Sequence, residues 1–457
     1  MAEDCSKRKN LSDPKKPDES TTAASSPVNE IDIISTLPDF LLCHILSFLP
    51  DKTTSIVATT SLLSRRWRYV WRDLPAFHFE TTAQTFRSLR TARTSRKFVL
   101  NGTIQEKEFS FVQSWIESAI VGPSLEELQV YFASINIRKP LIRLPIFRST
   151  ALVTIIFRGN GRGFTILNHS SYHLPSLKTM TLHLESSNII EALLSGCPVL
   201  ETLNLYIYQL WFDYKPNPNP NNETIRVASS SLKSLDINAS YESEIIEELE
   251  IDAPSLEYLY LSISGSHQLE KVSARNLQKV ENAVLEFIGA DVDYSSIELL
   301  KEIRNACDLS LNLLPMDSIA LPTYELMEFN HLLRLHLTVQ NFSTKVVMDM
   351  LGKCRVLKDL TIVRKKGESQ GWTEPAEVPN CLVSHLELVV FDYMVLGSED
   401  EKEFIAYILK KGLILKSVTI CADPNPMGFN VDSTDVEELS LIPPASKTCY
   451  VRFHNFS

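Results

Sequence analysis

The sequence predicts an α/β protein: a small helical module, a long solenoid of repeats that each contain one strand, and a closing unit with a stable helix. Three observations carry this prediction. An apolar segment bounded by two prolines lies near the N-terminus, a short aliphatic strand pattern recurs along the chain, and a well-capped helix lies near the C-terminus. With 457 residues, the chain is too long for one ordinary core but suits an elongated array.

Composition and charge indicate the cellular compartment and exclude some classes of partner. The first 29 residues are polar and rich in Ser, Thr and Pro, which predicts a disordered tail without a signal segment after Met1. No apolar run approaches the roughly 20 residues that cross a bilayer. The eight cysteines lack C-x-x-C pairs, so we expect reduced thiols. A net charge of −11 argues against nucleic acid as a partner. We expect the protein in the cytoplasm, the nucleus or both.

The N-terminal module begins with a helix between Pro38 and Pro50. Proline suits the start of a helix and stops its interior, so about three turns fit between them. Only Asp39, His44 and Ser47 are polar in this segment, and apolar side chains circle most of the helix. One side can pack inward, and another side needs a partner.

A second amphipathic helix is predicted over residues 56–71. Trp67 and Trp71 are one helical turn apart on one side, and arginines are interleaved with them. A module this short buries too little apolar surface to be stable alone. We therefore expect association with a partner or docking on the domain that follows.

From about residue 98 the pattern changes to short strands at nearly fixed intervals. The template is an apolar residue, two others, an apolar residue, one other and an apolar residue, which predicts a strand with alternate side chains inward. Successive starts are 23 to 32 residues apart, close to the 20–29 of leucine-rich repeats. The template occurs at Leu125/Leu128/Val130, Leu152/Ile155/Phe157, Leu177/Met180/Leu182, Leu200/Leu203/Leu205, Leu232/Leu235/Ile237, Leu256/Leu259/Leu261, Val280/Ala283/Leu285, Ala306/Leu309/Leu311, Leu332/Leu335/Leu337, Leu357/Leu360/Ile362, Val383/Leu386/Leu388 and Leu415/Val418/Ile420.

Helices are expected between some of these strands, over residues 188–194 and 344–351, and before the array over residues 109–120. The long interval around residues 213–222 is read as a Pro/Asn-rich loop. A solenoid of this kind exposes one continuous sheet on its concave side, where a partner protein can bind. The residues expected on this face are Glu127, Gln129, Glu257, Tyr258, Tyr260, Arg334 and His336.

The C-terminal stretch contains a helix between residues 396 and 411. Ser398 and Glu401 have capping-box spacing, and Lys410 and Lys411 lie at the negative end of the helix. The side chains expected to face the core are Phe404, Ile405, Ile408 and Leu409.

Two of these units resemble known domains. The run Leu37-Pro38, the apolar helix after it, Pro50-Asp51-Lys52 and Leu63 to Trp71 resemble the F-box of plant proteins in order, spacing and residue type. Residues 371–453, with Trp372, Val378-Pro379-Asn380-Cys381-Leu382 and Tyr407-Ile408-Leu409, closely resemble the FBD domain of plant F-box and leucine-rich-repeat proteins.

The resemblance implies a three-helix F-box over residues 30–78, a leucine-rich-repeat horseshoe over 98–370 and an FBD domain over 371–453. It implies an F-box that docks on a Skp-type adaptor and thereby joins a cullin-based, SCF-type ubiquitin ligase. The segment 53–60 is a few residues longer than is usual, which indicates a looser loop between helices. Carried over residue by residue, the residues that contact or support the adaptor are Leu37, Pro38, Leu41, Ile45, Leu46, Leu49, Pro50 and Trp67.

Catalysis is not indicated, because no nucleophile, acid/base pair, metal-ligand or nucleotide-binding motif can be assembled from the sequence. No cofactor and no metal are expected. The favoured interpretation is a substrate receptor of a ubiquitin ligase, for an unknown protein substrate and with or without a small-molecule ligand. The alternative is a leucine-rich-repeat interaction scaffold that does not lead to degradation, in which the F-box-like segment is a structural cap.

Overall fold

The fold is taken from a computed structural model of the chain. It describes residues 33–48, 59–60, 62–70, 76–80, 96–104, 116, 125–134, 142–144, 148–159, 164–166, 172–184, 187, 189–208, 223–241, 246–265, 271–288, 295–314, 327–339, 344–364, 371–394, 399–422 and 433–454.

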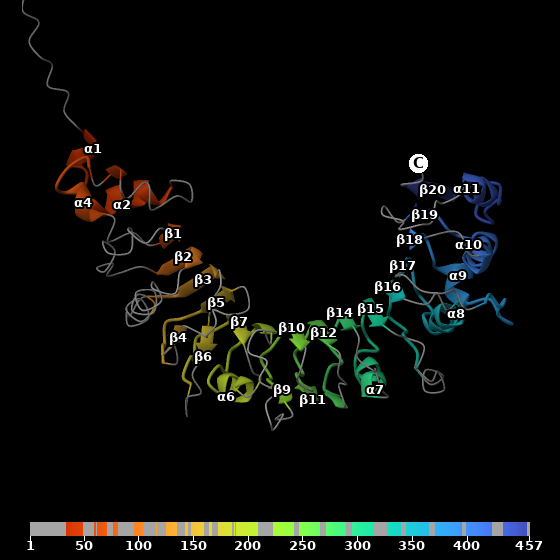
Figure 1. Cartoon of the computed structure of the whole chain (residues 1–457), viewed down its shortest axis with the longest axis horizontal. Coiled ribbons are helices and arrows are strands. Elements are labelled where there is room, and N and C mark those ends of the chain that lie inside the picture. The colour runs from red at the N-terminus through yellow and green to blue at the C-terminus, as the bar shows by residue number, and fades with distance from the viewer. Residues whose placement is uncertain are drawn as a thin grey trace, which may run out of the picture.

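Most of the described chain forms one arc (Figure 1). Its inner side is a single parallel sheet, which within the described residues has 15 strands in the order β1-β2-β3-β5-β7-β8-β10-β12-β14-β15-β16-β17-β18-β19-β20. This confirms the predicted α/β solenoid. The strands are β1 Ala76–Glu80, β2 Lys97–Ile104, β3 Glu127–Ser134, β5 Thr154–Gly159, β7 Thr179–Leu184, β8 Thr202–Tyr208, β10 Ser234–Tyr241, β12 Tyr258–Gly265, β14 Asn282–Ile288, β15 Asp308–Leu314, β16 Arg334–Val339, β17 Asp359–Arg364, β18 Leu388–Met394, β19 Ser417–Ala422 and β20 Tyr450–His454.

The repeats stack because equivalent apolar residues pair across neighbouring strands. Leu235 pairs with Leu259, and Leu259 with Ala283, so the inward side chains form continuous buried ladders. Each strand thus covers the apolar face of the next, which a single repeat cannot do alone. Beyond the twelve predicted strands, β1, β2 and β20 also join the sheet.

One repeat is out of phase with the prediction. The template placed Leu388 inward, but Leu388 pairs with Asp359 and is 41% exposed, whereas Val389 and Phe391 are buried. The correct set is Leu386/Val389/Phe391, which puts Leu386 midway between Leu357 and Leu415. The segment contains apolar residues in both phases, so the pairing with β17 decides the register.

The convex side carries helices and two small sheets (Figure 1). The predicted helices over residues 188–194 and 344–351 are present as α6 Ile190–Ser195 and α8 Thr344–Lys353, and α7 is Ser295–Glu302. The small sheets were not predicted. They consist of β9 Glu223–Ala228, β11 Ile246–Asp252 and β13 Lys271–Arg275, and of β4 Ile142–Leu144 with β6 Phe164–Ile166.

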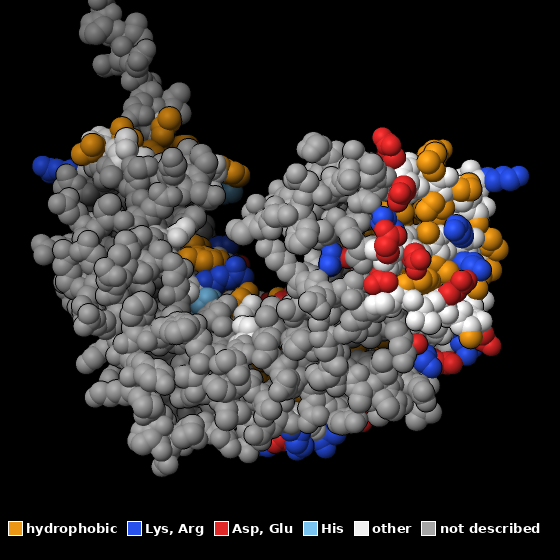
Figure 2. Space-filling view, turned by 45° about the vertical axis from the view of Figure 1, so that its right-hand side comes forward, with side chains coloured by type: hydrophobic (Ala, Val, Ile, Leu, Met, Phe, Trp, Pro, Cys, Tyr) orange, Lys and Arg blue, Asp and Glu red, His pale blue; other side chains and the backbone are white. Residues whose placement is uncertain are grey.

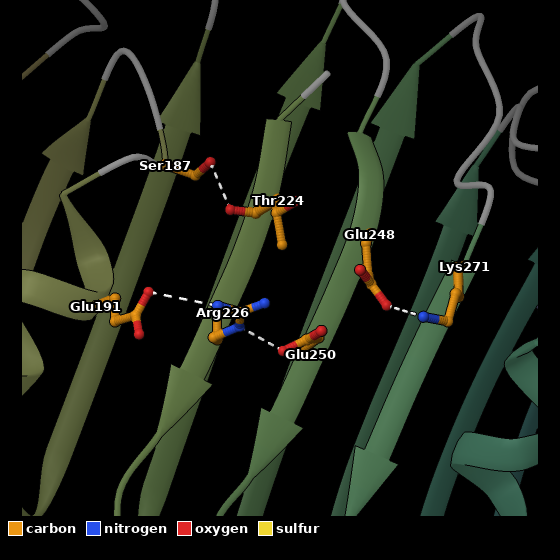
Figure 3. A network of polar contacts seen from close by, with 7 residues as sticks. All are labelled: Ser187, Glu191, Thr224, Arg226, Glu248, Glu250 and Lys271. Atoms are coloured by element: carbon orange, nitrogen blue, oxygen red, sulfur yellow. Dashed lines mark hydrogen bonds and ion pairs between the residues drawn. The ribbon is translucent and has the colours of Figure 1, made fainter. Parts of the chain in front are cut away.

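A charge ladder crosses the three-stranded convex sheet (Figure 3). Arg226 on β9 forms ion pairs with Glu250 on β11 and, at 3.6 Å, with Glu191 on α6. Glu248 on β11 pairs with Lys271 on β13. Because the charges neutralise one another across the strands, the ladder holds the outer layer together.

The C-terminal unit continues the sheet and covers it with helices. The elements are α9 Asn380–Ser384, β18, α10 Glu399–Lys411, β19, α11 Ser433–Ser440 and β20. The four residues predicted to face the core from α10 are all fully buried. Glu401 on α10 is also fully buried and pairs with Arg364 of β17 at 2.6 Å. This ion pair ties α10 to β17, the last strand before the C-terminal unit.

The N-terminal module contains α1 Ile33–Thr36, α2 Asp39–Ser47 and α4 Trp67–Val70. The single helix predicted over residues 56–71 is wrong, because residues 62–66 are not helical: 62–63 and 65–66 lie in turns. The Trp67 N–H donates to Ser64 Oγ at 3.3 Å, as in a helix N-cap, so a new helix begins here. Arg66 pairs with Asp39 at 2.6 Å and ties this segment to the start of α2.

Several predictions lie outside the described residues. They are the tail 1–29, Leu49, Pro50, Trp71, the loop 213–222, Ser398 and the helix 109–120, except that Ile116 is helical and fully buried.

Candidate interaction surfaces

The first candidate surface is the outer face of α2. Leu42, Cys43 and Leu46 point inward, where the Cys43 thiol donates to the Val70 carbonyl at 3.1 Å. On the other side Ile45 is 44% exposed, and Phe48 is 74% exposed. An apolar face of this kind on a folded module marks a protein interface.

The predicted adaptor residues divide between this face and the core. Leu37 and Leu41 are half-buried, Pro38 and Ile45 are exposed, and Leu46 and Trp67 are buried. Leu46 and Trp67 therefore support the module from within. The large exposed apolar residues of the described module that were not chosen are Ile34, Phe40, Phe48, Leu62 and Leu63. The almost complete apolar circle of the helix could have indicated Phe40 and Phe48. Figure 2 shows hydrophobic side chains exposed over this module at the upper left.

The second candidate surface is the concave face of the sheet, whose hollow is visible in Figure 2. Strand residues that alternate with the buried leucines present their side chains here in rows. The row of Glu127 continues through Ser234, Tyr258 and Arg334, as the strand pairings show. The predicted residues on this face are Glu127 and Gln129 on β3, Tyr258 and Tyr260 on β12, and Arg334 and His336 on β16.

Glu257 is placed differently. It precedes β12 and is exposed at the rim of the sheet, where its N–H donates to the Lys233 carbonyl at 2.8 Å. In this rim row Glu201 pairs with Lys178 at 3.2 Å and with Lys233 at 3.1 Å. Glu257 thus lies beside the concave rows of Tyr258 and Tyr260 and not within them.

Polar and aromatic side chains that the sequence reasoning did not select meet near the middle of the concave face. The His183 ring on β7 stacks on Tyr206 of β8 with ring centroids 4.7 Å apart. Burial, helped by the charge of Arg158 on β5, lowers the pKa of His183 to about 4, so this histidine is neutral at pH 7. Only the strand register could have indicated them, because each lies one position beyond the last residue of its template.

Two carboxylates belong to the same region. Burial raises the pKa of Asp236 on β10, against the opposing charge of Arg158 and a hydrogen bond from Tyr206. The Tyr260 hydroxyl donates to Glu286 of β14 at 2.9 Å, and burial together with this bond raises the pKa of Tyr260 to about 12. Further along, Arg334 pairs with Asp308 at 2.7 Å. The face can therefore offer rings, charges and hydrogen-bond acceptors to a partner.

The described residues contain neither a candidate metal site nor a helix that could span a membrane. They contain no group of three or more His, Cys, Asp or Glu side chains placed to hold a metal ion. None of their helices is both long and apolar enough to span a bilayer. The cysteines among them are free thiols, and burial raises the pKa of Cys197 to about 12, which makes it unreactive.

A helical module with an exposed apolar face, joined to a leucine-rich-repeat solenoid, defines a protein built for protein interactions. Comparison with known proteins specifies the units. Residues 34–79 match the family described as F-box domain, and residues 374–420 match the family described as FBD. Residues 112–294 match the family described as FBD-associated F-box protein At5g56370, LRR repeats.

Two relatives align with almost the whole chain. Probable FBD-associated F-box protein At1g32375 of Arabidopsis thaliana is 28% identical over 448 residues, which cover 93% of this chain and 100% of the relative. F-box/FBD/LRR-repeat protein At1g78750 of Arabidopsis thaliana is 26% identical over 469 residues, 92% and 96% of the two chains. The chain therefore carries the F-box, leucine-rich-repeat and FBD units of F-box/FBD/LRR-repeat proteins and is similar to such plant proteins along nearly its whole length. F-box/LRR proteins are typically non-catalytic adaptors.

Proposed function

We propose that this protein is the substrate-recognition subunit of an SCF-type ubiquitin ligase. In this role the F-box binds a Skp-type adaptor and, through it, a cullin scaffold. The solenoid binds a target protein, and the transfer chemistry takes place on other subunits. The mechanism is proximity, because holding the target near the transfer machinery replaces a bimolecular encounter. The work would take place in the cytoplasm, the nucleus or both.

The observation that carries this proposal is the exposed apolar face of α2 in a segment that matches the F-box domain. Ile45 and Phe48 would bury their exposed area against the adaptor, and Leu37, Pro38 and Leu41 would flank them. At roughly 25 cal/mol per Å² of apolar area removed from water, such a contact stabilises both association and the small module itself.

The test is adaptor binding by the complete chain, measured by calorimetry or biolayer interferometry. Ile45→Asp is the informative change, because it places a carboxylate in the proposed contact at a cost of about 2–3 kcal/mol, or roughly a hundredfold in Kd. Leu46→Asp would instead disrupt the core of the module, since Leu46 is 8% exposed.

The matched control is Ser47→Asp, which adds the same charge to an exposed polar position of the same helix. It should retain binding within about threefold, because Ser47 lies outside the proposed contact. Both changes place a negative charge near the C-terminal end of α2, so their effects on the helix dipole are similar and cancel in the comparison. Equal binding by the Ile45 and Ser47 variants would refute the contact. No binding of the wild-type chain to any Skp-type adaptor would leave the alternative, a repeat scaffold that does not lead to degradation.

A further inference from the structure

Five side chains on four neighbouring strands make a distinct strip at the centre of the concave face. We name it the aromatic–acidic strip: Tyr206 on β8, Asp236 on β10, Tyr258 and Tyr260 on β12, and Glu286 on β14. Asp236 and Tyr260 are paired positions, and Tyr206 and Glu286 lie in one row through residues 238 and 262. With strands about 4.8 Å apart, the strip spans about 15 Å, which suits a short stretch of extended chain.

Asp236 has unused hydrogen-bonding capacity. Its Oδ1 atom is buried and has no hydrogen-bond partner among the described residues. A buried acceptor left in this state costs free energy, so a donor supplied from outside would stabilise the strip. Tyr206 and the charge of Arg158 act on this carboxylate from the side of β8 and β5. The side towards β12 and β14 receives no cation from the described concave rows.

Charge continues this asymmetry towards the C-terminal half of the arc. The carboxylates of Asp392, Asp308 and Glu286 all act on His336, where they oppose the effect of burial on its pKa. From β8 to β17, the described concave rows contain one Lys or Arg, which is Arg334, and it is already paired with Asp308. This half of the face is therefore complementary to positive charge.

The tyrosine rings indicate which kind of cation suits the strip. Tyr258 is 38% exposed and lies beside Asp236. Tyr206 on β8 and Tyr260 on β12 flank Asp236 from the two neighbouring strands. Aromatic faces attract Lys and Arg side chains, whose alkyl stems also cover apolar surface. A hydrated metal ion would gain little from the rings.

We infer that the aromatic–acidic strip binds a Lys or Arg side chain of an extended segment of the target protein, with Asp236 and Glu286 receiving its donors and the tyrosine rings enclosing its stem. This inference rests on the proposed function, because it names the substrate class for the same concave surface. On this inference, the solenoid recognises a basic residue in an unstructured or strand-like segment of the target.

The probe is a positional peptide array. Each spot carries nonapeptides randomised at every position except a fixed central Lys, Arg, Gln or Glu, and the complete labelled chain is applied to it. Lys and Arg spots should retain at least about fivefold more protein than Gln spots, the size of a single desolvated cation contact. Adaptor binding is measured separately on the same preparations, so failure of the proposed function is seen independently.

Two variants locate the contact. Asp236→Asn keeps the shape but removes the charge, and Tyr258→Ala removes an exposed ring; each should abolish the preference for basic peptides. The control Asp252→Asn removes a carboxylate from the convex sheet, where Asp252 accepts a hydrogen bond from Asn276 at 2.9 Å, and should keep the preference.

Thermal unfolding of each variant establishes that the solenoid is folded, and Tyr258→Ala decides the question if Asp236→Asn does not fold. Three results would overturn the inference: equal retention on Lys and Gln spots, a preference for Glu, or a preference for Lys that survives in Tyr258→Ala.

Discussion

The ion pair between Arg364 and Glu401 gives the sharpest prediction about how the FBD unit is held on the repeats. Glu401 is completely buried and Arg364 nearly so, and their charged atoms are 2.6 Å apart. Removing one partner of a buried pair leaves the other charge desolvated and costs about 3–5 kcal/mol. Glu401→Gln should therefore destabilise the attachment of α10 to β17 by that amount.

Hydrogen exchange of the α10 amides in the complete chain measures this locally. Since each 1.4 kcal/mol is a factor of ten, Glu401→Gln should accelerate exchange by about a hundredfold or more. The control is Glu399→Gln on the same helix. Glu399 is exposed, and its partner Lys402 keeps an ion pair with Glu438 at 3.4 Å, so exchange should change by less than about fivefold.

A double variant separates the cost of a lone charge from the value of the pair. Replacing both partners with apolar residues, Arg364→Met with Glu401→Leu, removes the unpaired charge and should restore much of the protection lost in Glu401→Gln. If Glu401→Gln exchanges no faster than Glu399→Gln, the buried pair does not hold α10 and the reasoning is wrong.

Two other predictions concern the repeats. A Cβ at Gly196 would lie 2.5 Å from a backbone oxygen, so Gly196→Ala should lower Tm. A Cβ at Gly352 in α8 would meet nothing within 4 Å, so Gly352→Ala should raise the free energy of unfolding by up to about 1 kcal/mol. Thermal unfolding compares the two variants with the wild-type chain. His183 has a folded-state pKa of about 4, below its unfolded value of 6.5, so its contribution to stability is present above pH 6.5 and lost as the pH falls through 4. His183→Gln should flatten the pH dependence of Tm in that window, and an unchanged slope would contradict a buried neutral imidazole.

The repeats could be predicted from the sequence because the same apolar pattern recurs many times. Eleven of the twelve predicted triplets are in phase, and they identify a solenoid even where single members, such as those on Ala283 and Ala306, are weak; both alanines are buried in their strands or just before them. The same periodicity could not fix the register at Leu386, because that segment is apolar in both phases. Pairing with β17 supplies the missing information, and it is a contact between strands.

The concave site was less predictable for a related reason. Alternation along a strand identifies which side chains point away from the core. The position of Asp236 next to Tyr206 and Tyr260 depends on the register of three strands. At the N-terminus, the hydrophobic circle of α2 indicated a partner without distinguishing buried Leu46 from exposed Ile45. That distinction depends on where α4 packs, since Cys43 and Val70 meet across the two helices.

The FBD unit is part of the concave surface as well as a cover for the end of the array. Strands β18 and β19 pair in parallel with β17 and β20, so the row of Asp359 passes through Leu388 and Ser417 to Tyr450 without interruption. Asp392 of β18 already acts on the pKa of His336 two strands away. Substitutions in the FBD unit can therefore alter the charge that a target meets on the repeats, which makes the boundary between the two units a boundary of sequence pattern and not of the binding face.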